Sequence, residues 1–453
     1  MSTYIVLKFG GSSQCEIGTS VILRKIKEYI EHGYKIILVI SAVGKTTNNL
    51  YNIVNFETDK YEIIYDIHKK YCENIGIEFN LIEPLLNELK ICMEDYISKS
   101  FVNISQQKLK IISFGECLAS LIVHHFLLKH NIYNNIINAH LFMKNSSSSE
   151  AIDSITLDIN GKYYCDNNIL SKLISQEGNI FVTQGFICTT SDNKYCVLTR
   201  SGSNTTASLI AASECILAER LEIWTDVNGL YTTDPRKVKE AKLIKNVKYK
   251  VAQESATMGS QLVHPLSIEP CELKSIPIYI KNTFNAECEG TIINCKDMYI
   301  ENKVHLIVCQ SNVTIFQIES LDMNEGSGFL SEMFNVFKEE NINLNIVTTG
   351  QFLVTTTTNE KSEIKINKAV YKLSKKYRVN IIPKCSIVSI IANNISDNDA
   401  ILNIHMIINK FKKKFDKSPI YLIHQSPNDM ALSYVVNEKI ADEFTQILHN
   451  ELI

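Results

Sequence analysis

Short apolar runs that end in glycine or polar residues mark the first part of the chain. Residues 4–9 and 35–40 predict buried strands, and the amphipathic segment 21–30 between them predicts a helix. Residues 48–144 then show a helical spacing of Ile, Leu and Tyr, and two later apolar runs, at 180–183 and 221–224, predict further strands. The order strand, turn, helix, strand predicts a parallel sheet covered by helices.

The pattern changes after about residue 293, where two similar series of elements follow one another. The first predicts strand, helix, strand, strand and helix at 313–320, 328–340, 343–348, 352–357 and 364–377, and the second predicts the same order at 386–392, 400–415, 420–424, 430–436 and 441–448. Such a repeat is typical of paired ferredoxin-like modules. We therefore expect one domain at 1–295 and two modules at 305–380 and 381–453.

Composition and charge narrow the class of protein. The 453 residues are 45% hydrophobic and carry a formal charge of −3, which gives no reason to expect a nucleic-acid or membrane partner. Thirteen cysteines without a CxxC pair, and histidines without ligand spacing, predict free thiols in a reducing cytosol and no bound metal. The N-terminus has no basic flank or cleavage site, and no apolar run approaches the roughly 18 residues of a membrane span.

A candidate phosphate site follows the first strand. Lys8 stands at the end of that strand, and Gly10 and Gly11 follow it, so that one ammonium and free backbone N–H groups could hold phosphate. A surface lysine before a tight turn fits the same residues. The stretch 44–47 resembles the end of a P-loop, but Val39 stands where that motif needs glycine, so we reject it. Its threonines remain hydroxyl donors to an anionic substrate.

Three further segments carry polar chemistry. Residues 113–116 place Glu116 at the predicted start of a helix, where it could also simply complement the helix dipole. Residues 199–206 precede an apolar helix predicted at 207–218; Arg200 there can bind a carboxylate and the Ser/Gly backbone an oxyanion, although an N-cap loop is the alternative. Residues 224–236 offer the aromatic, hydroxyl, carboxylate and guanidinium groups that a nucleotide needs. Together the segments predict phosphoryl transfer from ATP.

In this order, the motifs resemble those of aspartate kinases, in the amino-acid-kinase superfamily, over essentially the whole chain. The matching stretches are KFGGSS (8–13), SAVGKTTNNL (41–50), SFGE (113–116), FVTQGF (181–186), TRSGSNTTA (199–207), EIWTDVNGLYTTDPRKV (222–238), ATMGSQLVHP (256–265) and IKNTFNAECEGTII (280–293). The resemblance implies a three-layer α/β sandwich with a mainly parallel sheet, followed by two ferredoxin-like βαββαβ ACT modules. It also implies transfer of the γ-phosphoryl group of Mg-ATP to the side-chain carboxylate of L-aspartate, giving 4-phospho-L-aspartate.

The resemblance also implies a role for each matching residue. Lys8 and the residue at 204, here Asn204, would be catalytic; Thr47, Glu116, Arg200, Ser201, Gly202 and Ser203 would bind the amino acid; Lys8, Gly10, Gly11, Thr225, Asp226, Tyr231, Arg236 and Gln261 would bind ATP; and Met323, Gly328, Phe329, Leu330, Asn345 and Thr349 would surround an amino-acid effector. Glu116 would read the substrate ammonium and Arg200 its α-carboxylate. Mg²⁺ would be held mainly by the nucleotide, and the ACT modules imply a homodimer or higher homo-oligomer in the cytoplasm.

The chain departs from the family pattern near the predicted centre. Asn204 replaces an aspartate, Thr199 and Ser201 replace glycines, and Gln261 replaces a lysine. In the regulatory part, Asn345 and the pair Gly350-Gln351 replace the carboxylates of lysine-sensing members. Two alternatives to an ordinary aspartate kinase therefore remain open. One is a kinase with another amino-acid or carboxylate acceptor, and the other is a catalytically silent regulatory homologue.

Overall fold

The computed structural model describes residues 3–56, 61–98, 103–153, 157, 159–198, 201–260, 262–295, 304–319, 328–396, 399–414 and 419–453. Its internal contacts divide the chain into two compact units. The first comprises Met1–Leu230, Leu243–Gln253 and Leu262–Met298, and the second comprises Tyr231–Lys242, Glu254–Gln261 and Tyr299–Ile453. Each unit is built around its own sheet.

The first unit contains an eight-stranded sheet in the order β10-β12-β11-β9-β1-β2-β6-β3. Its strands are β1 (Thr3–Phe9), β2 (Lys35–Ile40), β3 (Asn135–Ile136), β6 (Ile180–Gln184), β9 (Leu217–Thr225), β10 (Asn246–Lys248), β11 (Ile278–Asn282) and β12 (Thr291–Asn294). All neighbours pair in parallel except β11 and β12, which are antiparallel. The mainly parallel sheet predicted from the apolar runs is thereby confirmed.

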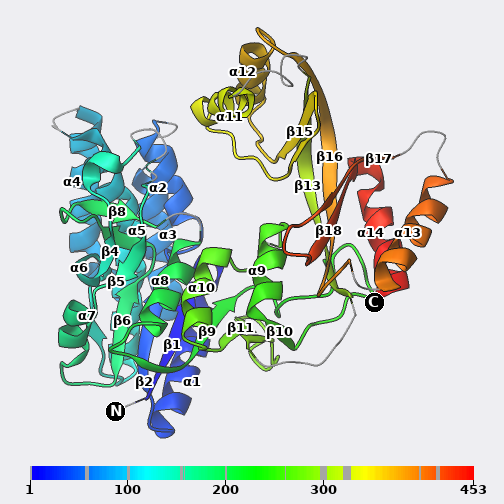
Figure 1. The fold of residues 1–453 in the computed structure, drawn as a ribbon. Coiled ribbons are helices and arrows are strands. Elements are labelled where there is room, and N and C mark those ends of the chain that lie inside the picture. Colours follow the sequence, from blue (N-terminus) through cyan, green and yellow to red (C-terminus); the bar gives the residue numbers. More distant parts are fainter. Residues whose placement is uncertain are drawn as a thin grey trace. The chain divides into compact units, whose positions relative to one another are not determined.

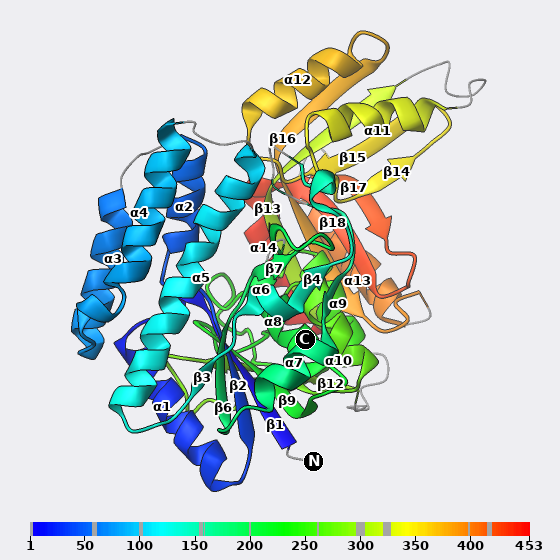
Figure 2. The same ribbon diagram turned by 90° about the vertical axis from the view of Figure 1, so that its left-hand side faces the viewer.

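Helices cover both faces of this sheet. The helices of this unit are α1 (Glu16–Glu31), α2 (Thr46–Val54), α3 (Tyr61–Ile75), α4 (Glu83–Ser98), α5 (Ile104–Lys129), α6 (Ala139–Phe142), α7 (Asn167–Ile174), α8 (Gly202–Ala211), α9 (Tyr249–Thr257) and α10 (Glu269–Leu273). Alternate side chains of β1, β2 and β6 form one apolar core with α1–α5, of which α2–α5 lie together in Figures 1 and 2. Helix α8 contacts β1, β2 and β9 without sharing that core, so it covers the opposite face.

A second, smaller sheet lies beside the main one in the same unit, and the apolar pattern does not predict it. Its order is β5-β4-β7-β8, formed by β5 (Tyr163–Cys165), β4 (Met143–Asn145), β7 (Ile187–Thr189) and β8 (Tyr195–Val197). Each strand has three residues, which is too short for a clear alternation of polar and apolar positions. The β7–β8 hairpin leads directly toward α8.

Helix α5 corrects one expectation. Among the described residues it is the one helix long and apolar enough to cross a membrane, whereas the sequence pattern suggested that no segment approaches that length. Buried residues make up 72% of its most apolar window, and they pack in the core that α5 shares with the sheet. Its hydrophobicity therefore matches its position as a core helix.

The second unit is built on one six-stranded antiparallel sheet in the order β14-β15-β13-β16-β18-β17. The elements are β13 (Val304–Glu319), α11 (Phe329–Glu339), β14 (Val347–Thr349), β15 (Leu353–Thr358), α12 (Glu363–Leu373), β16 (Arg378–Ala392), α13 (Asp399–Lys412), β17 (Ile420–Gln425), β18 (Ala431–Asn437) and α14 (Glu438–Leu452). Figure 1 shows α11 and α12 near one end of the long strands and α13 and α14 near the other. Each helix pair covers its own apolar core, as expected for two ferredoxin-like ACT modules.

Strands β13 and β16 run through both halves of this sheet. Residues 304–310 pair with 387–392, and residues 313–319 pair with 378–385. A register shift near Asn312, whose φ is 59°, separates the two stretches of β13. Residues 304–310 pair in the half of the sheet that α13 and α14 cover. They therefore precede, along the chain, every element of the half that α11 and α12 cover.

Candidate active site

The first unit contains a hollow of about 490 Å³ near the carboxyl ends of β1 and β2. It is lined by Lys8, Ser41, Thr47, Asn48, Tyr51, Glu116, Phe186, Val197, Leu198, Ser201, Gly202, Ser203 and Asn204. Ligands of open α/β sheets bind where parallel strands end, and this volume is in the range of small-molecule sites. The structure thus brings together, in one pocket, residues that lie up to 196 positions apart in the sequence.

Lys8 is the buried cation of this pocket. Its side chain is only 8% exposed, and its Nζ lies 3.3 Å from the point that a β-carbon on Gly10 would occupy. Burial lowers the Lys8 pKa to about 8, while the charges of Asp226 and Glu116 act in the opposite direction. An ammonium held with little water around it is well suited to neutralise charge on a phosphoryl group.

The turn after β1 leaves no room for side chains. The Gly10 N–H donates to the Trp224 carbonyl at 3.1 Å, and the Gly44 N–H donates to the Gly11 carbonyl at 3.0 Å. A β-carbon on Gly11 would lie 2.8 Å from the carbonyl oxygen of Ala42, which is backbone and cannot move aside cheaply. The turn therefore depends on glycine at 11. The Gly10 N–H is bonded to Trp224, so it is not one of the free donors expected from the sequence.

Glu116 is the buried anion of the pocket, and it lies in the middle of a helix. Because α5 starts at Ile104, the first-turn position predicted for Glu116 is wrong, and the helix-dipole alternative no longer applies. Its Oε1 accepts from the Thr47 hydroxyl at 3.3 Å and the Ala42 N–H at 3.4 Å, whereas its buried Oε2 has no hydrogen-bond partner among the described residues. Burial raises the Glu116 pKa to about 8. A carboxylate oxygen placed this way is suited to accept from a ligand ammonium.

Helix α8 begins earlier than the sequence predicts. We expected a helix at 207–218, but α8 spans Gly202–Ala211, so Ser203 and Asn204 lie in its first turn. The hydroxyl and amide side chains of Ser203 and Asn204 favour a loop in the sequence, but both residues are buried in the structure. Ser203 packs closely against Gly185, where an added β-carbon would lie 2.5 Å from the Ser203 side chain. The first turn of α8 lines the pocket through Gly202, Ser203 and Asn204, and helix N-termini of this kind can bind anions. The Asn204 N–H already donates to the Ser201 carbonyl at 2.8 Å.

Two features of this loop bear on the departures from the family pattern. Ser201 has φ 62° and ψ 24°, a left-handed conformation that glycine adopts more easily. Asn204 is 8% exposed, and its Oδ1 has no hydrogen-bond partner in the part of the chain that the structure describes. Thr199 and Arg200 lie outside the described residues, so the structure does not place the predicted contact of Arg200.

The residues predicted to bind the nucleotide fall into three groups. Thr225 ends β9 in the first unit, and its hydroxyl donates to the exposed Asp226 carboxylate at 3.1 Å. Tyr231 and Arg236 belong to the second unit, where the 87% exposed Arg236 binds Asp234 through Nη2–Oδ2 at 2.8 Å and Nε–Oδ1 at 2.9 Å. Gln261 lies outside the described residues.

The predicted effector residues are placed only in part. Met323 lies outside the described residues, while Gly328, with φ 99°, precedes the first turn of α11. The Phe329 ring packs edge-on against Tyr377, with centroids 4.8 Å apart, so it belongs to the module core more than to a ligand site. Leu330, Asn345 and Thr349 are exposed.

One buried group near the site was missed by sequence reasoning. Glu222 on β9 is 1% exposed, although it stands between the apolar residues Leu221 and Ile223. Its carboxylate accepts from Tyr29, Arg220 and Trp224. The signal available in the sequence was a lone carboxylate inside an otherwise apolar strand.

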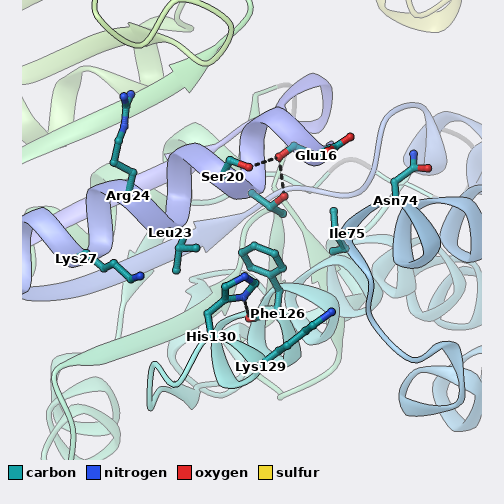
Figure 3. Close-up of a pocket in the computed structure, with 11 residues that line it drawn as sticks. Glu16, Ser20, Leu23, Arg24, Lys27, Asn74, Ile75, Phe126, Lys129 and His130 are labelled. Carbon is teal, nitrogen blue, oxygen red and sulfur yellow. Dashed lines mark hydrogen bonds between the residues drawn. The ribbon is translucent and has the colours of Figure 1, made fainter.

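Another hollow, of about 460 Å³, lies between α1 and the ends of α3 and α5 (Figure 3). Several of its polar groups already bond to helix carbonyls: Ser20 to that of Glu16, His130 to that of Phe126, and Lys129 to that of Gly76. Figure 3 shows Arg24 directed away from Phe126, and its guanidinium pairs with Glu287. No set of unpaired polar atoms converges there among the labelled side chains, so we do not assign it a ligand.

The described residues contain no group of three or more His, Cys, Asp or Glu side chains that could hold a metal ion. The pocket around Lys8 contributes one carboxylate, that of Glu116, whose Oε1 is already bonded to Ala42 and Thr47. A divalent ion would therefore have to reach this site with most of its ligands supplied by another molecule.

Comparison with known proteins places these features in a family. The model of the amino acid kinase family matches residues 3–282. The bifunctional aspartokinase/homoserine dehydrogenase of Buchnera aphidicola is 30% identical over 99% of this chain, which spans 56% of that relative's length. The lysine-sensitive aspartokinase 3 of Escherichia coli is 25% identical over the full length of both chains.

Solved structures show the same fold. The E. coli aspartokinase III complex with aspartate and ADP covers 100% of both chains with a TM-score of 0.79 and 23% identity. The Clostridium acetobutylicum aspartate kinase covers 99% of this chain and 100% of its own, with a TM-score of 0.75 and 22% identity. The match extends over the sheet of the first unit and the antiparallel sheet of the second. Because the family model, the relatives and the fold agree, this chain belongs to the amino acid kinase family.

Proposed function

We propose that this chain is an aspartate kinase. It transfers the γ-phosphoryl group of Mg-ATP to the side-chain carboxylate of L-aspartate, and the products are 4-phospho-L-aspartate and ADP, the first step toward lysine, threonine and methionine. One observation carries the proposal: a buried cation, Lys8, and a buried carboxylate, Glu116, line the same pocket. The names of these relatives, and the aspartate and ADP bound by E. coli aspartokinase III, support the choice of substrates.

The proposed role of each residue follows from its charge and its hydrogen-bonding groups. Lys8 neutralises the oxygens of the transferring phosphoryl group, beside the turn at Gly10 and Gly11. Glu116 and Thr47 receive the substrate ammonium. Its α-carboxylate is received by Arg200, by Ser201 and by the first turn of α8 at Gly202 and Ser203. Thr225, Asp226, Tyr231, Arg236 and Gln261 frame the nucleotide.

The chemistry needs no general base. A carboxylate oxygen of aspartate is already anionic, attacks the γ-phosphorus, and displaces ADP as the bond to the β,γ-bridging oxygen breaks. Catalysis then consists of alignment and charge neutralisation. Mg²⁺ arrives with the nucleotide and supplies further neutralisation of the phosphates. The near absence of carboxylates from the pocket supports a metal held mainly by ATP.

A second candidate keeps ATP but changes the acceptor. Ser201 adds a side chain where the family has glycine, and Asn204 is neutral where the family has aspartate, so the amino-acid end of the pocket differs in shape and charge. A catalytically silent homologue is less well supported, because a silent chain has no reason to retain both Lys8 and Glu116 buried in one pocket.

Acceptor screening separates these candidates. ADP release is measured with Mg-ATP and a panel of aspartate, glutamate, N-acetylglutamate and other amino or carboxylic acids. We expect release that depends on L-aspartate and that is lost in Lys8→Ala. Faster release with another acceptor would select the second candidate, and no release with any acceptor from folded protein would select the silent homologue.

The domain organisation and the regulation of the chain follow the same family pattern in our proposal. We propose a catalytic domain at 1–295 and regulatory modules at 305–380 and 381–453, with an amino-acid effector near Met323, Gly328–Leu330, Asn345 and Thr349. The lysine complex of E. coli aspartokinase III supports an effector of this class. We further propose that the chain forms a homodimer or higher homo-oligomer and that it lies in a reducing cytoplasm. The thirteen free cysteines support the reducing compartment.

A further inference from the structure

We propose that Glu222 is a positioning residue for nucleotide binding, which acts through Trp224 on the turn at Gly10. The inference rests on the proposed kinase function, because it assigns that turn to the phosphates of ATP. Glu222 lies on the face of the sheet that packs against α1, so it touches no substrate itself.

The two oxygens of the Glu222 carboxylate have different partners. Oε1 accepts from the Tyr29 hydroxyl at 2.8 Å and from Arg220 Nε at 2.7 Å. Oε2 accepts from the indole Nε1–H of Trp224 at 3.0 Å. The ion pair therefore anchors one oxygen, and the other is left to orient the indole.

Trp224 connects this carboxylate to the phosphate turn. Its ring is fully buried and stacks on Phe9, with centroids 5.5 Å apart and planes 2° from parallel. Its carbonyl accepts from the Gly10 N–H at 3.1 Å and from the Ser13 hydroxyl at 3.5 Å. Gly10 in turn is the residue beside the Lys8 ammonium. A chain of direct contacts thus runs from Glu222 to the catalytic end of β1.

Stability alone gives a weak reason for this arrangement. A buried ion pair often stabilises a fold no better than apolar residues of similar size. The carboxylate is instead placed where it fixes an aromatic ring, and that ring fixes the backbone at the phosphate turn. Enzymes commonly hold their reacting groups through such outer contacts, because small displacements reduce activity strongly.

The test compares two variants that remove different donors from the same carboxylate. Trp224→Phe keeps the stacked ring but loses the bond to Oε2, and Tyr29→Phe loses a bond to Oε1 while the Arg220 pair remains. Binding of Mg-ADP is measured by calorimetry, together with the KM for ATP and the KM for aspartate. We expect Trp224→Phe to weaken Mg-ADP binding and raise the KM for ATP by about tenfold, with the KM for aspartate unchanged. Tyr29→Phe should stay within about twofold of the natural protein.

Trp224 is the single tryptophan of the chain, which supplies a direct optical readout for Glu222 itself. In the natural protein, Mg-ADP should change the Trp224 emission, and in Glu222→Gln the emission should shift and the change should require about tenfold more Mg-ADP. Equal Mg-ADP affinity in Trp224→Phe, Tyr29→Phe and the natural protein would overturn the inference, even if Glu222→Gln does not fold. Mg-ADP binding without aspartate phosphorylation would overturn the proposed function alone, and no binding of Mg-ADP by the natural protein would overturn both.

Discussion

The Lys8 ammonium lies 3.3 Å from the point that a β-carbon on Gly10 would occupy. The backbone at Gly10 is extended, with φ −71° and ψ 168°, so any residue can adopt it. The requirement for glycine at this position is therefore one of space beside Lys8 and not of backbone conformation.

We expect Gly10→Ala to lower kcat by about ten- to a hundredfold with little change in stability, because the added methyl group displaces the end of the flexible Lys8 side chain. Steady-state kinetics and thermal unfolding of the same preparation check this result. Gly11→Ala provides the contrast, since its methyl group meets backbone at 2.8 Å and should destabilise the fold itself. A Gly10→Ala enzyme with the natural kcat would mean that the Lys8 position is not critical.

The pH dependence should be set by Lys8 and Glu116. The Lys8 pKa is lowered to about 8, so its charge is lost as pH rises through that value; the Glu116 pKa is raised to about 8, so its charge is lost as pH falls through it. Phosphoryl transfer needs the Lys8 cation, and binding of the substrate ammonium needs the Glu116 anion. The kcat/KM for aspartate should therefore peak near pH 8 and fall on both sides, with a limiting slope of about tenfold for each pH unit. Bound substrates stabilise both charges, so kcat should vary less.

The variant Glu116→Gln isolates one side of this profile. Its KM for aspartate should rise strongly while its KM for ATP stays close to the natural value, and the fall of kcat/KM on the acidic side should disappear. The two groups titrate as a pair, so the limits belong to the pair and not to either residue alone. A kcat/KM that is flat between about pH 6 and 9 in the natural enzyme would contradict this assignment.

Asn204 allows the missing charge of the family pattern to be restored. Asn204→Asp places a carboxylate in the pocket that holds Lys8, which should raise the Lys8 pKa and move the alkaline fall of activity to higher pH. Asn204→Ser serves as a neutral control and should leave that limit in place. An unchanged alkaline limit in Asn204→Asp would indicate that residue 204 does not act on Lys8.

The backbone at Ser201 is strained for a residue that has a β-carbon. Its φ of 62° is left-handed, a conformation that is unfavourable for residues with a β-carbon by about 1 kcal/mol. We expect Ser201→Gly to raise the free energy of unfolding by up to about 1 kcal/mol, and chemical denaturation measures it. A loss of stability on this substitution would show that the Ser201 side chain contributes contacts that outweigh the strain.

Much of the first unit could be predicted from local patterns. The apolar runs that became β1 and β2 are buried and flanked by clear turn residues, so their hydrophobicity alone identifies them. The motifs around Lys8 and Glu116 likewise pointed to one site, and the structure brings them into one pocket. Local sequence was sufficient where burial and turn chemistry agreed.

The wrong predictions arose where tertiary packing overrides local preference. Gly115 sits inside α5 because a β-carbon there would lie 3.0 Å from that of Ala42, so a residue that suggested a helix start is required for close packing. The polar first turn of α8 is buried against Gly185, and it was mistaken for a loop. Strands β13 and β16 pair through both modules, and such long-range pairing leaves no periodic signal.

The most direct test of the account is trapping of the acyl phosphate with hydroxylamine. The purified natural chain is incubated with L-aspartate, Mg-ATP and hydroxylamine, beside the Lys8→Ala and Glu116→Gln variants. We predict aspartyl hydroxamate that requires both substrates, is lost in Lys8→Ala, and is recovered in Glu116→Gln only at much higher aspartate concentrations. Folded natural protein that forms no aspartyl hydroxamate, or a Lys8→Ala variant that forms it at the natural rate, would contradict the account.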